Sequence, residues 1–252
     1  MNNKKVNFYS VIIGTELLNG RRKDAHFTFL NEQLLHRGWE HKASFVIEDD
    51  TNLMNNIFNL IKADENSVMF CFGGIGSTPD DYTRVEAAKA FTNGKMQFHK
   101  KAKELIENRF KEDAYPHRIH MAYLPINAKL LKNVVNNVAG FYLEDRFFFT
   151  PGFPSMSQAM VIEALDKHYL KSEEKYRVSL TAFCVENLLI DVMKKISKNI
   201  DFSSLPRIKE GERRVVISLA GYNKKEVDDN FVLFTNYLDD NKIKYILDDI
   251  NL

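Results

Sequence analysis

The sequence has few of the residues that cross-link or break up a chain. It holds two cysteines, six prolines and eleven glycines among 252 residues, which excludes a disulfide scaffold, a collagen-like repeat and a mainly disordered chain. Cys71 and Cys184 lie in apolar runs, so we expect two buried free thiols. No apolar run reaches the roughly 18 residues of a membrane-spanning helix. We therefore expect a globular protein of the cytoplasm.

An excess of charge of one sign is also missing. Lys and Arg total 35 against 34 Asp and Glu, which leaves a formal net charge of +1. Proteins that bind the phosphate backbone of nucleic acids normally carry a basic excess. We therefore expect neither nucleic acid nor a membrane as a partner. The seven histidines show no metal-ligand spacing, and the G-x-S-x-G motif of serine hydrolases is absent.

Strand-like and helix-like patterns alternate in the first third of the chain. Apolar runs at 6–13, 43–47 and 68–72 predict buried strands, and apolar residues at helical spacing follow the first two runs. Thr78, with Pro79 after it, predicts the start of a third helix. Such alternation predicts an α/β fold, a three-layer αβα sandwich around a mostly parallel sheet. Further along we expect helices at 97–113 and 155–170 and a strand at 146–150.

A charged stretch at 171–175 predicts a domain boundary, so we expect two domains, 1–172 and 173–252. The second domain shows the order strand, helix, strand, strand, helix, strand. This βαββαβ order predicts a small α+β domain. We expect these elements at 178–185, 188–200, 206–209, 213–219, 224–240 and 244–247.

The most informative segment is 68–83, where a buried strand leads into three glycines within four residues. Glycines let backbone N–H groups approach an anion closely, and ligands of open α/β sheets bind at the carboxyl ends of the strands. The loop is not a Walker A motif, because no Gly-Lys-Ser/Thr follows. It is not a dinucleotide motif either, because Pro79 stands where the third glycine belongs. The pattern therefore predicts a phosphate site of another kind.

Acidic residues accompany this loop. The simplest interpretation of Asp80 and Asp81 is helix capping, with Thr78 and Asp81 as a capping box. Alternatively, a divalent cation such as Mg²⁺ or Mn²⁺ lies between these carboxylates and a bound phosphate, because without it they would repel each other. Glu16 and Asp49 follow other predicted strands. The ends of parallel strands meet at one edge, so the sequence predicts an acidic cluster there.

Together these residues resemble the CinA-type branch (competence/damage-inducible protein A, N-terminal domain) of the molybdopterin-binding-like family. The resemblance covers roughly 5–170 and implies the three-layer αβα fold without the deamidase domain of full-length CinA. This sequence has Thr15 where the family has Asp, His26 for Asn, Ser77 for Pro and Glu48 for Gly. The matching segments are 13–20, 24–26, 49–50, 73–83, 121–125, 140–141 and 151–155.

The resemblance also implies a function and a site. It implies a metal-dependent pyrophosphohydrolase acting on ADP-ribose or a related dinucleotide such as FAD, with Asp81 and Asp49 as catalytic residues and, together with Asp80, as metal ligands. The alternatives are a protein that binds molybdopterin or another pterin phosphate without turnover, and a degenerate domain that binds other proteins. Thr15 and His26 bear on hydrolysis more than on ligand binding. We also expect a homo-oligomer. The residues implied to bind phosphate or line the pocket are Gly73, Gly74, Gly76, Ser77, Thr78, Thr83, Glu16 and Asp24.

Overall fold

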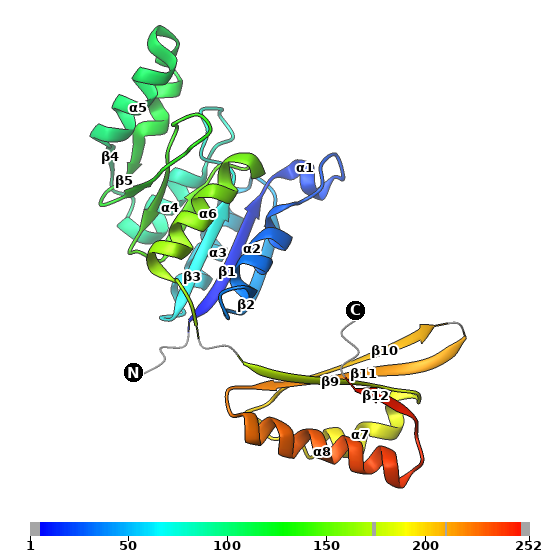
Figure 1. Cartoon of the computed structure of the whole chain (residues 1–252). Coiled ribbons are helices and arrows are strands. Elements are labelled where there is room, and N and C mark those ends of the chain that lie inside the picture. The colour runs from blue at the N-terminus through cyan, green and yellow to red at the C-terminus, as the bar shows by residue number, and fades with distance from the viewer. Residues whose placement is uncertain (1–5, 173–174, 210, 248–252) are drawn as a thin grey trace. The chain divides into compact units, whose positions relative to one another are not determined.

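The computed structural model describes residues 6–172, 175–209 and 211–247, so Glu173 and Glu174 of the predicted boundary lie outside the described residues. Contacts divide the chain into two compact units, Met1–Ser172 and Glu173–Leu252. Figure 1 shows that each unit has its own sheet. Within the described ranges, no helix is both long and apolar enough to cross a membrane.

A six-stranded sheet with the order β2-β1-β3-β8-β7-β6 forms the centre of unit 1. The neighbouring pairs β2–β1, β1–β3 and β3–β8 are parallel, whereas β7 runs antiparallel to both β8 and β6. The predicted mostly parallel sheet is therefore confirmed. The strands are β1 (Asn7–Ile13), β2 (His41–Ile47), β3 (Ser67–Phe72), β6 (Lys129–Leu131), β7 (Gly140–Leu143) and β8 (Phe147–Thr150).

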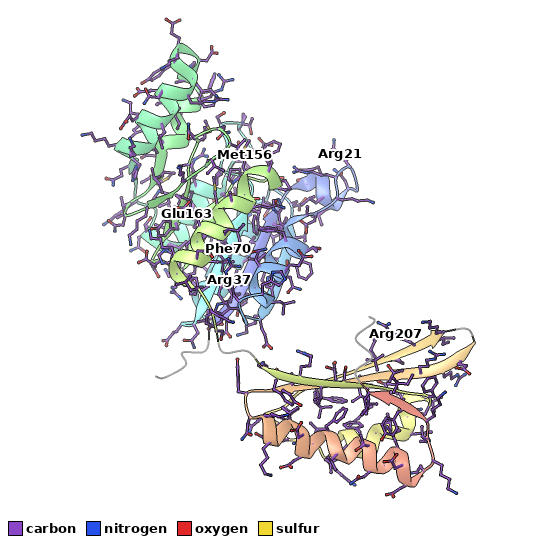
Figure 2. The ribbon with its side chains drawn as sticks, in the orientation of Figure 1. Arg21, Arg37, Phe70, Met156, Glu163 and Arg207 are labelled. Carbon is purple, nitrogen blue, oxygen red and sulfur yellow. The ribbon has the colours of Figure 1, made fainter. Side chains whose placement is uncertain are left out.

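Helices cover both faces of this sheet, which confirms the three-layer αβα sandwich. On one face α2 (His26–Leu35) and α6 (Pro154–His168) pack on Phe70, which Figure 2 shows in the interior. On the other face α3 (Thr51–Lys62) and α4 (Thr83–Thr92) pack on strand residues that include Val11, Met69 and Phe149. Each fully buried aromatic or aliphatic side chain contributes about 1.5–3 kcal/mol to folding. The sheet is thus a rigid base for the loops at its edge.

The remaining elements of unit 1 lie outside the main sheet. The helix expected at 97–113 is shorter because residues 96–98 pair with a second short strand, and the His99 side chain caps the helix by accepting from the Ala102 N–H at 3.2 Å. These elements are α1 (Thr15–Leu18), β4 (Met96–Phe98), α5 (Lys100–Phe110), 3-10 helices at Lys111–Ala114 and Arg118–Ala122, and β5 (Tyr123–Pro125).

Unit 2 is a four-stranded antiparallel sheet with the order β10-β11-β9-β12, and its helices lie on one face (Figure 1). The predicted βαββαβ order is confirmed. Its core contains Leu180, Ile217 and Phe234. The elements are β9 (Tyr176–Ala182), a 3-10 helix (Glu186–Leu189), α7 (Ile190–Met193), β10 (Asp201–Lys209), β11 (Glu212–Gly221), α8 (Lys224–Asp240) and β12 (Tyr245–Leu247).

Two further expected helices differ from the structure. The helix expected at 188–200 is only the 3-10 helix and α7, because Ser197 leaves the helical path: its N–H donates to Asn230 Oδ1 at 2.9 Å and its hydroxyl donates to Glu226 Oε1 at 2.7 Å. Thr78 does not begin the third helix, since α4 begins at Thr83. The intervening residues form a turn of the glycine-rich loop.

Candidate functional site

Three strand ends of unit 1 approach each other closely, and glycines stand at their points of contact. Gly73, directly after β3, has a φ of +102°, and a Cβ there would lie 2.6 Å from the Ile13 carbonyl oxygen at the end of β1. A Cβ on Gly152, just after β8, would lie 3.3 Å from the Gly73 Cα. The glycines therefore place the loops after β1, β3 and β8 side by side at the carboxyl edge of the sheet.

The loop after β3 (residues 73–83, the glycine loop) is closed by its own acid. Asp81 Oδ1 accepts from the Gly76 N–H at 2.8 Å, while Oδ2 accepts from the Thr78 N–H at 2.8 Å and the Thr78 hydroxyl at 2.6 Å. The bond from Asp81 back to the Thr78 N–H is the one expected of a capping box, although the helix begins five residues later. Both oxygens of Asp81 thus bind the loop itself.

Residues of the first turn of α4 donate hydrogen bonds to carbonyl groups of the glycine loop. The Thr83 hydroxyl donates to the Gly73 carbonyl and the Thr83 N–H donates to the Gly74 carbonyl, each at 3.0 Å. Buried Arg84 donates from Nη1 to the Gly76 carbonyl at 2.6 Å. Burial lowers the pKa of Arg84, although the nearby Asp81 carboxylate raises it in part. These bonds fix the path of the loop backbone.

The loop amides divide into occupied and available donors. Gly73 donates to the Thr150 carbonyl at 2.9 Å, and Asp81 occupies the amides of Gly76 and Thr78. In the part of the chain that the structure describes, the N–H groups of Gly74, Ile75 and Ser77 have no hydrogen-bond partner. Backbone N–H groups of this kind bind anions. The loop therefore offers different amides from those of Gly73, Gly76 and Thr78, which we expected from the sequence.

A cavity of about 220 Å³ lies against the glycine loop. For comparison, a cavity of about 150 Å³ is enough to bind benzene, so this one has room for a fused ring. Most of its surface is apolar, and its polar side chains are those of Ser77, Arg118, Asn133 and Asn136. Figure 2 shows Met156 of the lining at the start of α6. The lining residues are Ile75, Gly76, Ser77, Phe110, Arg118, Met121, Asn133, Asn136, Val138, Pro151, Phe153 and Met156.

Arg118 is the charged side chain of this cavity. Its guanidinium lies over the Phe110 ring, 4.8 Å from the centroid, and its Nη1 donates to the Asp113 carbonyl oxygen at 2.9 Å. The Asp113 carboxylate is 4.0 Å away and 85% exposed, so this ion pair is weak. Among the described residues no group accepts from Nε or Nη2 of Arg118. The cavity therefore has a cation with free donors.

Glu16 and Asp24 line a smaller pocket of about 10 Å³, room for a single water molecule. Arg22 lies 3.4 Å from Glu16 and donates to the Gly152 carbonyl at 2.9 Å. Asp24 caps α2 by accepting from the N–H groups of His26 and residue 27 at 2.9 and 3.0 Å. Both acids have structural contacts, and neither lines the larger cavity.

His26, which stands where the family has Asn, is buried beside this small pocket. Its ring stacks on Phe72 with centroids 4.4 Å apart, Nε2 lies 3.3 Å from the Gly152 carbonyl and Nδ1 lies 3.3 Å from the Ser157 hydroxyl. Burial lowers the pKa of His26, against the Gly152 carbonyl and Asp24, which raise it. His26 therefore supports the turn that carries residues 151–154.

The acids that the sequence predicts as metal ligands do not form a preformed metal site. Asp49 Oδ2 accepts from the Thr15 N–H at 3.0 Å and its hydroxyl at 2.9 Å, and both oxygens of Asp81 bind the loop. Asp80 is exposed. Among the described residues, no group of three His, Cys, Asp or Glu side chains is placed to hold a metal ion. Mg²⁺ in proteins is usually bound by one or two carboxylates together with waters and substrate phosphates, so a metal at Asp49 or Asp81 stays a prediction.

Sequence reasoning missed most of the larger cavity. Of the expected residues only Gly76 and Ser77 line it. Arg118 follows a segment with neither helical nor strand periodicity, and Asn133 and Asn136 lie in a loop. Three asparagines among residues 133–137 are a turn signal, and they were the available hint of an ordered loop.

Sequence comparison shows which known proteins this chain is similar to. The sequence profile of a family described as "Probable molybdopterin binding domain" matches residues 10–171. A protein of Caldivirga maquilingensis is 27% identical over 235 residues, covering 87% of this chain and 90% of that protein. A CinA-like protein of Kosmotoga olearia is 28% identical over 226 residues, covering 85% of this chain but only 54% of that protein. The chain thus spans about half of this longer CinA-like relative.

A solved structure shares the fold of unit 1. The crystal structure of CinA with unknown function from Thermoplasma acidophilum is 25% identical, with a TM-score of 0.58. The match covers 66% of this chain and 98% of that one. The resemblance carried by the glycine loop and the strand-end motifs is confirmed.

Proposed function

From its membership of the molybdopterin-binding domain family, CinA type, we propose that this chain binds a small molecule that joins a phosphate to a flat ring, such as a pterin phosphate. The phosphate binds at the glycine loop and the ring enters the cavity of about 220 Å³ beside it. Binding without turnover is the function that the geometry favours.

One observation carries this proposal: the available amides and the cavity belong to the same residues. Ile75 and Ser77 line the cavity and have backbone N–H groups without a partner in the described residues. Asp81 and Arg84 already hold the loop, so little conformational entropy is lost when an anion binds to these N–H groups. Apolar side chains such as Phe110 and Met121 offer the opposite environment, suited to a ring.

Hydrolysis of a pyrophosphate such as ADP-ribose or FAD with Mg²⁺ or Mn²⁺ is the second candidate. Asp49 favours it, because Oδ1 of that residue has no partner among the described residues and is open to a cation. We place it second because Asp81 uses both oxygens on the loop. Thr15, which stands where the family has a carboxylate, instead donates to Asp49.

Calorimetric titration with a pterin monophosphate and with ADP-ribose, each with and without Mn²⁺, tests the proposal. Chromatography of the same samples detects any AMP released. We expect saturable binding and recovery of the intact ligand. AMP release that requires Mn²⁺ would instead establish hydrolysis, and no binding at millimolar ligand would exclude both and leave a protein-interaction domain.

A pair of variants locates the binding site. Ile75→Pro removes one available N–H group next to the cavity, and we expect weaker binding of both ligands. The control is Val134→Pro, which places a proline at an exposed loop position outside the cavity lining. Similar affinities of the two variants would place the phosphate elsewhere.

A further inference from the structure

We propose that Arg118 selects the ring of the ligand: it favours a ring with two hydrogen-bond acceptors side by side, as in hypoxanthine, guanine or a pterin, over adenine. This inference rests on the proposed function, since it assumes that a ring enters the cavity of about 220 Å³. It makes Arg118 a specificity-determining residue, a role that the glycine loop cannot fill because phosphate is common to all these ligands.

The orientation of Arg118 is set by two contacts. Its guanidinium lies on the Phe110 ring at 4.8 Å, and Nη1 is held by the Asp113 carbonyl oxygen at 2.9 Å. Phe110 and Arg118 both line the cavity. The edge formed by Nε and Nη2 has no acceptor among the described residues. This edge carries two parallel N–H donors, the geometry that binds a pair of acceptors at once.

Three acceptors of the cavity lining already accept hydrogen bonds from the protein itself. Asn136 Oδ1 accepts from the Val138 N–H at 2.9 Å, and Asn133 Oδ1 accepts from the Val135 N–H at 3.0 Å. The Gly76 carbonyl accepts from Arg84 at 2.6 Å.

Several donors of the lining, by contrast, have no strong partner. Asn136 Nδ2 has only the weak acceptor Met156 Sδ, at 3.6 Å, and the amides of Ile75 and Ser77 have no partner in the described part of the chain. With Arg118 added, the cavity presents several free donors, and the Ser77 hydroxyl of its lining can either donate or accept. A ligand that presents acceptors satisfies these groups, whereas a donor placed against them leaves two donors facing each other.

The hydrogen-bonding groups of the ring decide which ligand fits these donors. Guanine presents O6 and N7 as adjacent acceptors, and a guanidinium binds both. Hypoxanthine has the same pair, and a fully oxidised pterin has O4 and N5 in the same relation. Adenine has N7 beside an amino group, which is a donor. Arginine has no acceptor to offer it. The amino group of adenine would therefore face the Nε and Nη2 donors of Arg118 without forming a hydrogen bond.

Inosine monophosphate and adenosine monophosphate test the inference directly, because they share sugar, phosphate and N7 and differ at position 6. Titration calorimetry of the full chain should show inosine monophosphate binding at least about tenfold more tightly than adenosine monophosphate. Arg118→Met should reduce that ratio to about one. Arg118→Lys keeps the charge without the two parallel donors, so it should also lose most of the ratio.

Arg109→Met is the matched control, since Arg109 is an exposed arginine of the neighbouring α5 that does not line the cavity. It should leave the ratio unchanged. Circular dichroism melts of each variant establish folding, and if Arg118→Met does not fold, Arg118→Lys and the unmodified chain carry the test.

The outcomes separate this inference from the proposed function. Equal affinity of the unmodified chain for both nucleotides, or tighter binding of adenosine monophosphate, overturns the role of Arg118 while leaving a phosphate-binding protein. An unchanged ratio in both Arg118 variants also overturns it. Failure of both nucleotides and of a pterin monophosphate to bind overturns the proposed function and this inference together.

Discussion

The carboxylate of Asp81 accepts a hydrogen bond from the backbone N–H of Gly76 at 2.8 Å, and that bond leaves no room for a side chain at residue 76. A Cβ on Gly76 would lie 2.6 Å from Asp81 Oδ2. The glycine thus allows the acid to approach the backbone, and the acid shapes the loop. In this chain the Asp-Asp segment acts first on its own loop, before any ligand arrives.

Replacement of this acid should loosen the loop. In Asp81→Asn an amide N–H would face either the Gly76 N–H or the Thr78 N–H, so one charge-assisted bond becomes a donor-donor contact. We expect a loss of about 1–3 kcal/mol in the free energy of unfolding, measured by urea denaturation, and weaker phosphate binding. Asp80→Asn, at an exposed neighbour, should change stability by less than about 0.5 kcal/mol. Equal losses in the two variants would contradict the role of Asp81.

Two glycines with similar positive φ angles allow the cost of backbone strain to be measured separately from the cost of a steric clash. Gly74 and Gly94 have φ angles of +67° and +73°, but a Cβ on Gly74 would lie 2.1 Å from Thr83 Oγ1, whereas a Cβ on Gly94 meets nothing within 4 Å. Gly94→Ala should therefore cost only the left-handed strain, about 1 kcal/mol. Gly74→Ala should cost at least about 1 kcal/mol more, and should also break the Thr83 bond to the Gly73 carbonyl. Urea midpoints compare the pair, and identical losses would show that Thr83 moves aside freely.

Much of the fold follows from local sequence, because buried parallel strands are continuous apolar runs. Residues 68–72 form such a run, and β3 lies within a residue of it. Helix ends were predicted less well, because tertiary contacts decide them: the Asp81 bonds delay α4, and the Ser197 bonds end α7.

The glycine loop could be identified from sequence, since a strand followed by three close glycines is a local pattern. The cavity could not, because its lining comes from segments between residues 75 and 156 that are brought together only by the fold. The roles of individual side chains could not be predicted from the sequence either. Spacing alone does not tell whether Asp24 faces a ligand or, as found, caps α2.

His26 should make stability depend on pH. Burial lowers its pKa, so near neutral pH and below the folded chain binds fewer protons than the unfolded chain, whose histidine has a pKa of about 6.5. The stability from neutral His26 is therefore present above about pH 6.5 and is lost as pH falls below it, with a slope of at most about 1.4 kcal/mol per pH unit. Urea denaturation between pH 8 and 5 measures this slope.

His26→Asn, which restores the family residue, should make that slope shallower. Burial also lowers the pKa of His41 and His168, so part of the slope will remain. The matched control is His36→Asn at an exposed position, which should leave the slope unchanged. If His26→Asn and the unmodified chain have the same slope, the buried imidazole does not control acid stability.

Asp64 should matter at the opposite edge of the sheet. Burial raises its pKa, but Lys42 at 3.0 Å and Tyr9 and Asn7 at 2.8 Å lower it more, so the pKa lies below its ordinary value. Its contribution is present above about pH 4, where the unfolded carboxylate is charged, and is lost as pH falls through the lower folded value. Asp64→Asn should thus lower the melting temperature at pH 7, and the difference should shrink as pH falls below 4. A constant difference from pH 7 to 2 would show that the charge is irrelevant.

Phe153 should affect ligand binding far more than folding. It lines the cavity yet is 59% exposed, and Arg22 lies 5.5 Å from its ring, so its loss removes little buried area. A ligand ring stacked on it would lose that contact in Phe153→Ala, and base–aromatic stacking contributes about 1–3 kcal/mol. We expect affinity for a pterin monophosphate to fall about fivefold or more with an unchanged melting temperature. Leu18→Ala removes an equally exposed apolar side chain outside the cavity and should change neither quantity. Phe153→Leu separates stacking from apolar contact: affinity restored to the original level would mean that the ring of Phe153 is not required.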